Sequence, residues 1–121
     1  MDSNSWIEYK IQVRERIKVF ALNILELSSS LPTSERARIL NRQITRSGTS
    51  TYSNYRAALR ARSKAEFFAK LSVTVEEADE TEMWLDLIID SKISVSELAI
   101  QLHAESVEII KILATMRKRL K

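Results

Sequence analysis

The sequence contains very few of the residues that make tight turns or covalent links: 121 residues include one glycine, one proline and no cysteine. A β-sandwich or an α/β domain of this length needs many turns, which consume glycine and proline. Long helices with few connections are therefore the favoured architecture. The absence of cysteine excludes disulfides and thiolate metal sites, and it fits a cytosolic protein.

The sequence also lacks long hydrophobic runs. No stretch reaches the roughly 18 uncharged apolar residues that a membrane span needs. Asp2, Asn4 and Glu8 lie where a secretory signal would need a continuous apolar segment. We therefore expect a soluble cytoplasmic protein without a membrane partner, and its length fits one domain covering residues 1–121.

Hydrophobic periodicity predicts helices at about residues 5–28, 64–90 and 95–120, and a second helix that starts near residue 34 and reaches about residue 61 only if segment 45–54 is helical. Pro32 ends the first helix, Thr33 or Ser34 caps the second, and capping boxes beginning at Ser63 and Ser94 open the third and fourth. The predicted fold is all-α: a single-domain, antiparallel, up-down-up-down four-helix bundle. The residues expected in its core are Trp6, Val13, Ile17, Phe20, Ile24, Leu27, Leu40, Ile44, Tyr55, Leu59, Phe67, Leu71, Thr74, Ala78, Thr81, Leu85, Ile88, Leu98, Leu102, Ile109, Leu113, Met116 and Leu120.

The segment 45–54 is ambiguous because serine, threonine and glycine dominate it. Helix propensity alone favours a loop there. The competing interpretation is a helix whose small residues allow a neighbouring helix to approach closely. The residues alone favour neither alternative.

Charges of opposite sign are segregated along the chain. From Arg36 to Lys70 there are nine basic residues and one acid, whereas Glu76 to Asp90 contains seven acids and no base. One interpretation is two solvated faces, or helices that pair through salt bridges. The other is an arginine-rich surface for phosphate backbones. Its candidate nucleic-acid-binding residues are Arg38, Arg42, Arg46, Arg56, Arg60 and Arg62.

On a continuous second helix the first five of these arginines fall within roughly 80° of one another around the axis. No zinc-finger spacing, RNP-like aromatic motif or glycine-rich loop accompanies them. Any nucleic-acid binding would therefore depend on the phosphate backbone and have little sequence specificity.

The sequence offers no pattern for catalysis, a metal or a cofactor. Di-metal carboxylate bundles use a Glu-x-x-His motif, but the one histidine, His103, follows Ile100 by three positions. We interpret His103 as a surface or interface residue and expect a non-enzymatic protein. Trp6, Ile7, Phe68 and Trp84 are candidates for contacts between subunits, although each would equally suit the core of the monomer.

Residues Leu40 to Ser50, followed by Asn54, resemble the signature of the four-helix bundle proteins of the 23S rRNA intervening-sequence protein family. The resemblance covers about residues 13 to 91 and includes Leu31-Pro32 and the stretch Glu76 to Leu85. After Asn54 the chain departs from many members: Tyr55-Arg56-Ala57-Ala58 stands where they have Ile-Ala-Glu-Gly.

The resemblance implies a continuous second helix and a bacterial protein that forms a ring-like homopentamer. The similar retroelement accessory variability determinants form such a pentamer and bind nucleic acid and a reverse transcriptase. The resemblance therefore implies RNA or DNA, and a reverse transcriptase, as partners. The leading hypothesis is a nucleic-acid-binding accessory protein. The alternative is a protein-interaction scaffold that uses its charged helices for assembly.

Overall fold

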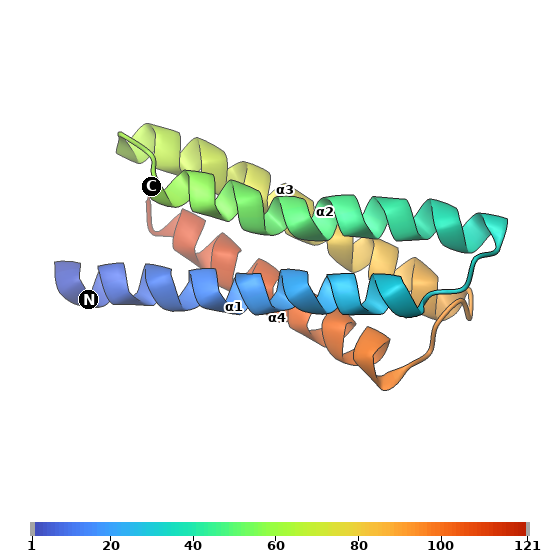
Figure 1. Ribbon diagram of the computed structural model, residues 1–121. Helices are drawn as coiled ribbons and strands as arrows, with labels where there is room; N and C mark the ends of the chain where they lie inside the picture. Colours follow the sequence, from blue (N-terminus) through green and yellow to red (C-terminus); the bar gives the residue numbers. More distant parts are fainter. Residues whose placement is uncertain (1, 121) are drawn as a thin grey trace.

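A computed structural model describes residues 2–120, so the first and last residues of the predicted domain lie outside the described part. Four helices make up the fold: α1 (Ser3–Ser30), α2 (Glu35–Leu59), α3 (Lys64–Asp90) and α4 (Glu97–Lys118). Each helix runs back along the one before it (Figure 1). Within these residues no strand is present, and the prediction of a single all-α domain is confirmed.

Two of the predicted helix boundaries need correction. The fourth helix is capped by Ser96, which accepts from the Ala99 amide at 3.1 Å, so the prediction of a capping box beginning at Ser94 was wrong by two residues. The first helix continues through its terminal serines because the hydroxyls of Ser29 and Ser30 donate to backbone carbonyl oxygens three positions earlier. These bonds satisfy the hydroxyls within the last turn.

All four helices begin with the same chemistry. An oxygen of the N-cap side chain accepts from the backbone amide three residues later, and this satisfies one of the free amides of the first turn. The four N-cap residues are Asp2, Ser34, Ser63 and Ser96. In each connection between helices the last residue is a serine whose side chain caps the next helix. Polar side chains therefore start the helices, and the chain needs few glycines.

The core lies along the axis of the bundle. Every α3 residue that the periodicity predicts is buried, from Phe67 to Ile88. The other predicted core positions are buried or partly buried, with Leu40, Leu59, Leu98 and Leu120 at the margin. Each helix packs against two neighbours, since α2 and α4 both contact α1 and both contact α3. The helices α1 and α3 are therefore diagonal partners across the bundle.

The ambiguous segment 45–54 is helical throughout. Gly48 is buried there, and a Cβ built on it would lie 3.0 Å from both Cγ1 and Cγ2 of Ile24 in α1. Ile24 is itself fully buried. Glycine at this position therefore lets the backbone of α2 approach α1 closely. Of the two alternatives for segment 45–54, the closely packed helix is the one that the structure has.

Tyr55 joins α2 to the first turns of α1. Its side chain is fully buried, and its hydroxyl donates to the Lys10 carbonyl oxygen at 2.8 Å. Burial raises the pKa of the phenol. The neutral hydroxyl thus satisfies a carbonyl within α1 while the ring fills the core.

None of the helices within residues 2–120 is both long enough and apolar enough to cross a membrane.

We expect Gly48→Ala to destabilise the protein by about 1–2 kcal/mol. Overpacking a filled core costs about 1–3 kcal/mol, and the gain in helix propensity over glycine recovers at most about 1 kcal/mol. The control is Ser53→Ala on the exposed face of α2, where the added propensity should leave stability unchanged or slightly raised. Urea unfolding at one fixed protein concentration measures both. A Gly48→Ala protein as stable as the control would show that the Ile24 side chain can move aside without lowering the free energy of unfolding.

Candidate nucleic-acid interface

The six candidate arginines are all exposed. Four of them, Arg38, Arg42, Arg46 and Arg56, lie on α2, on the face opposite its buried residues, because the helix continues unbroken through Gly48. Arg60 is the C-cap of α2, at the end of this face, and Arg62 lies in the connection to α3. The continuous helix therefore produces the single arginine face that the sequence predicted.

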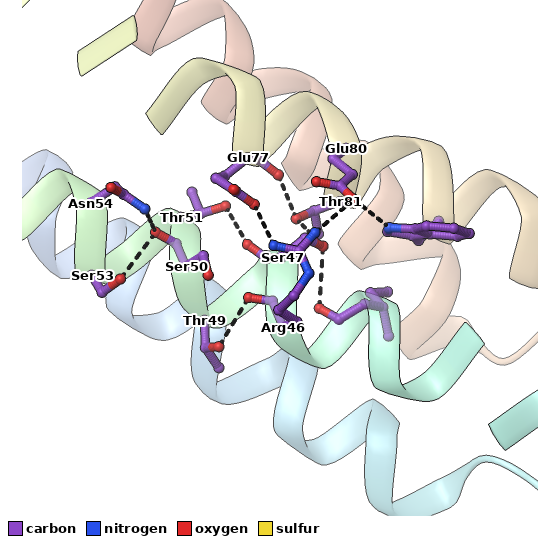
Figure 2. Close-up of polar contacts among 12 residues, drawn as sticks. Arg46, Ser47, Thr49, Ser50, Thr51, Ser53, Asn54, Glu77, Glu80 and Thr81 are labelled. Carbon is purple, nitrogen blue, oxygen red and sulfur yellow. Dashed lines mark hydrogen bonds and ion pairs between the residues drawn. The ribbon is translucent and has the colours of Figure 1, made fainter. Parts of the chain in front are cut away.

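One arginine of this face is used for a salt bridge inside the molecule. The Arg46 guanidinium contacts Glu80 Oε1 at 2.6 Å and Glu77 Oε2 at 3.2 Å, both on α3 (Figure 2). The hydrogen bond with Glu80 raises the pKa of Arg46, and the same bond lowers the pKa of Glu80. Pairing of the basic and acidic helices thus occurs at this point.

The other arginines are bound loosely or not at all. Arg62 Nε lies 3.8 Å from a Glu66 carboxylate oxygen, and the Arg56 guanidinium lies over the Tyr52 ring, 5.6 Å from its centroid. Within residues 2–120 the side chains of Arg38, Arg42 and Arg60 make no hydrogen bond or ion pair. Most of the arginine face is therefore available to a partner.

The serines and threonines near Gly48 serve packing. Thr81 Oγ1 donates to Ser47 Oγ at 2.8 Å and lies 2.7 Å from the Glu77 carbonyl oxygen (Figure 2). Thr51 donates to the Ser47 carbonyl oxygen at 2.9 Å. Among the described residues, every buried polar side-chain atom has a hydrogen-bond partner. These hydroxyls therefore close internal hydrogen bonds at the interface between α2 and α3.

A cleft of about 450 Å³ opens between α1 and α2, beside the arginine face. Two cations line it from each helix: Arg14 and Lys18 from α1, and Arg56 and Arg60 from α2. Arg14 and Lys18 were not among the residues predicted from the sequence, because both lie outside the basic block from Arg36 to Lys70. Their spacing of four places them on one helix face, but periodicity does not indicate which helix that face meets.

Two carboxylates and the histidine converge between α3 and α4. His103 Nε2 lies 2.6 Å from Glu82 Oε2, and one ligand atom each from Glu82, Asp86 and His103 fall within 4.8 Å of one another. An imidazole with two carboxylates is a donor set that suits a divalent transition metal. The group does not follow from a sequence motif, because its members come from two helices. His103 is half-buried at the surface, where its bond to Glu82 links α3 to α4.

The four residues predicted at subunit contacts divide into two kinds. Ile7 is 49% exposed, whereas Trp6, Phe68 and Trp84 are half-buried. Trp6 and Trp84 pack against the core of their own chain. Further exposed apolar side chains lie beside Ile7 on the outer face of α1, and another set lies on α3. They are Ile11, Leu22 and Leu25 on α1, and Val73, Met83 and Leu87 on α3.

The chain matches one family model and is similar to a solved structure. The family model of the 23S rRNA-intervening sequence protein matches residues 9–115. A solved structure of a protein with unknown function from the S23 ribosomal protein family of Bacteroides thetaiotaomicron VPI-5482 is 36% identical, with a TM-score of 0.81. That match covers 88% of this chain and 98% of the other. No curated protein matches the chain.

The bond between Arg46 and Glu80 makes a prediction about pH. Since the folded protein lowers the pKa of Glu80, the bond stabilises the fold above the ordinary carboxylate pKa, and the stabilisation is lost as pH falls through the folded value. Glu80→Gln should therefore cost up to about 1 kcal/mol at pH 7, because the pair is solvent-exposed, and less at about pH 3. Denaturant unfolding at the two pH values measures the difference.

The control is the same substitution in an Arg46→Gln background. There Glu80→Gln should lose most of its pH-dependent effect, because the partner that lowers the pKa is absent. An effect of equal size at both pH values would contradict the assignment.

Proposed function

The chain belongs to the 23S rRNA-intervening sequence protein family, and we propose that it is a non-enzymatic, homo-oligomeric protein that binds the backbone of RNA or DNA. Its role would be that of an accessory or ribonucleoprotein component. The observation that carries the proposal is the arginine face of α2, where Arg38, Arg42 and Arg60 have no partner within residues 2–120.

The chemistry of this face suits phosphate groups. A guanidinium presents a planar set of donors that matches phosphate oxygens, and neighbouring unpaired cations raise the local potential that attracts a polyanion. The face is formed by one straight helix and carries arginine rather than aromatic side chains along most of its length. Contacts to the backbone, with little reading of bases, follow from that composition.

A non-enzymatic role is supported by how the polar groups are used. The hydroxyls around Gly48 donate to backbone carbonyls or to one another. The imidazole of His103 contacts a carboxylate of α3, while the Ser106 hydroxyl donates to the carbonyl oxygen of the same histidine. This arrangement leaves the hydroxyls occupied in structural hydrogen bonds and away from the imidazole nitrogens that would activate a nucleophile.

Assembly into a ring is supported by the two exposed apolar faces. One comprises two pairs on α1, Ile7 with Ile11 and Leu22 with Leu25, which lie on either side of Arg14 and Lys18 along the same helix face. The other comprises Val73, Met83 and Leu87 on α3. The helices α1 and α3 are diagonal partners, so the faces point away from each other. A closed ring of more than two subunits needs two different surfaces that join head to tail. A pentamer is the state that the family resemblance implies.

The alternative function is a protein-interaction scaffold without nucleic acid. It is favoured by Asp79 and Asp90 on α3, which are exposed and have no ion pair within the described residues. In a ring they could pair with the arginines of a neighbouring copy. Such an assembly would depend strongly on ionic strength, because exposed charges are screened by salt.

We expect the triple substitution of Arg38, Arg42 and Arg60 by Gln to weaken binding of a labelled mixed-sequence single-stranded RNA. The slope of log affinity against log salt should fall by about 2, since each phosphate contact in single strands contributes about 0.7. The charge-matched control replaces Lys111, Arg117 and Lys118 of α4 by Gln. Fluorescence anisotropy over a salt series measures both. Equal losses in the two variants, or no binding by the wild type at low salt, would contradict the proposal.

A second prediction concerns the oligomer. Light scattering should give a wild-type mass near five subunits at both about 50 mM and about 500 mM salt, because apolar contacts are not screened. Leu22→Gln with Leu25→Gln should lower that mass, whereas the control pair Ile39→Gln with Ile100→Gln, equally exposed on α2 and α4, should not. A ring that dissociates only in high salt would favour the charge-based scaffold, and a monomeric wild type would contradict both.

A further inference from the structure

The cleft between α1 and α2 has the size of a ligand site. Its volume of about 450 Å³ lies within the range of about 300–1,000 Å³ that is typical of small-ligand pockets. Its walls are the side chains of two adjacent antiparallel helices, with Tyr52 and Leu59 contributing the less polar part. A flexible polymer could place one of its groups in this space while the rest stays on the surface.

The charges that line the cleft are unbalanced. Four cations face it, and the single acid, Glu15, already pairs with Arg14 at 3.2 Å. On each wall the two cations are four residues apart, an arrangement in which like charges repel each other along the helix. An anion held between the walls would relieve repulsion along both helices at once.

The cleft continues onto the arginine face. A second hollow of about 250 Å³ is lined by Ser53, Arg56, Ala57 and Arg60, so Arg56 and Arg60 border both spaces. The Arg56 guanidinium lies over the Tyr52 ring, and the Tyr52 hydroxyl makes no hydrogen bond within residues 2–120. The ring therefore positions Arg56 through its face, and the hydroxyl takes no part in that contact.

From these observations we propose that the cleft is a phosphate subsite for a nucleic-acid strand: Arg14, Lys18, Arg56 and Arg60 bind one phosphodiester group, and Tyr52 is the positioning residue of Arg56. The inference rests on the proposed function and adds a site on α1 to it. The strand enters along the arginine face of α2 and places its phosphate between the two helices.

The test uses the full chain, the labelled single-stranded RNA and variants that leave the arginine face intact. Arg14→Gln with Lys18→Gln removes two charges from the α1 wall, and Lys111→Gln with Lys118→Gln removes two charges from α4, which contributes nothing to the cleft. We expect the cleft pair to lower affinity at least about tenfold and the salt slope by up to about 0.7, because the cleft holds one phosphate, with little change in the control pair. Thermal melting confirms that both variants remain folded.

A second pair of variants tests the positioning role. Tyr52→Leu should lower RNA affinity several-fold, and Tyr52→Phe should retain it because the ring is kept. Loss in both variants would overturn the role of the ring. An affinity unchanged by Tyr52→Leu would overturn it as well.

The outcomes separate the subsite from the proposed function. Wild-type RNA binding that survives Arg14→Gln with Lys18→Gln overturns the subsite and leaves the α2 face as the binding surface. A titration with inorganic phosphate, followed by NMR of the arginine Nε groups, distinguishes a free anion from a strand. Phosphate that shifts Arg14 and Arg56 in a protein that binds no RNA would overturn both the proposed function and the assignment of the cleft to a nucleic-acid backbone.

Discussion

The close approach of α2 to its two neighbours is the constraint on which the rest of the structure depends. Gly48 brings the backbone of α2 against Ile24 of α1, and the Ser47 hydroxyl on α2 accepts a hydrogen bond from the Thr81 hydroxyl of α3. A larger residue at either position would push the helices apart, since interiors are packed to near crystal density. Among the described residues, every side-chain nitrogen and oxygen atom that is buried has a hydrogen-bond partner. Close packing therefore leaves no buried side-chain polar atom unpaired.

The same approach determines where the charges lie. Because the small residues of α2 face inward, the arginines at a spacing of four residues are turned outward along one straight helix. Because α1 lies so near, Arg14 and Lys18 come opposite Arg56 and Arg60 and form a cleft between them. Within the signature segment Leu40 to Ser50, Ser47 and Gly48 therefore act by packing, whereas Arg42 and Arg46 lie on the exposed face.

The sequence predicted the parts that depend on one helix at a time. The seven buried positions of α3 follow from 3–4 spacing alone, and the caps at Ser34 and Ser63 follow from local hydrogen bonding. It could not decide whether segment 45–54 is helical, because tertiary packing of Gly48 outweighs helix propensity there. It also missed the two groups that span helices, the cleft and the cluster around His103, because their members are far apart in sequence.

Only some of the segregated charges form ion pairs within the described residues. Of the five arginines along α2, Arg46 alone reaches the acidic face of α3, where Glu77 and Glu80 receive it. The remaining cations and acids thus point outward from neighbouring helices, and the molecule has a basic side at α1 and α2 and an acidic side at α3. A polyanion is attracted to the first and repelled by the second, so under the proposed function a strand would approach from the basic side.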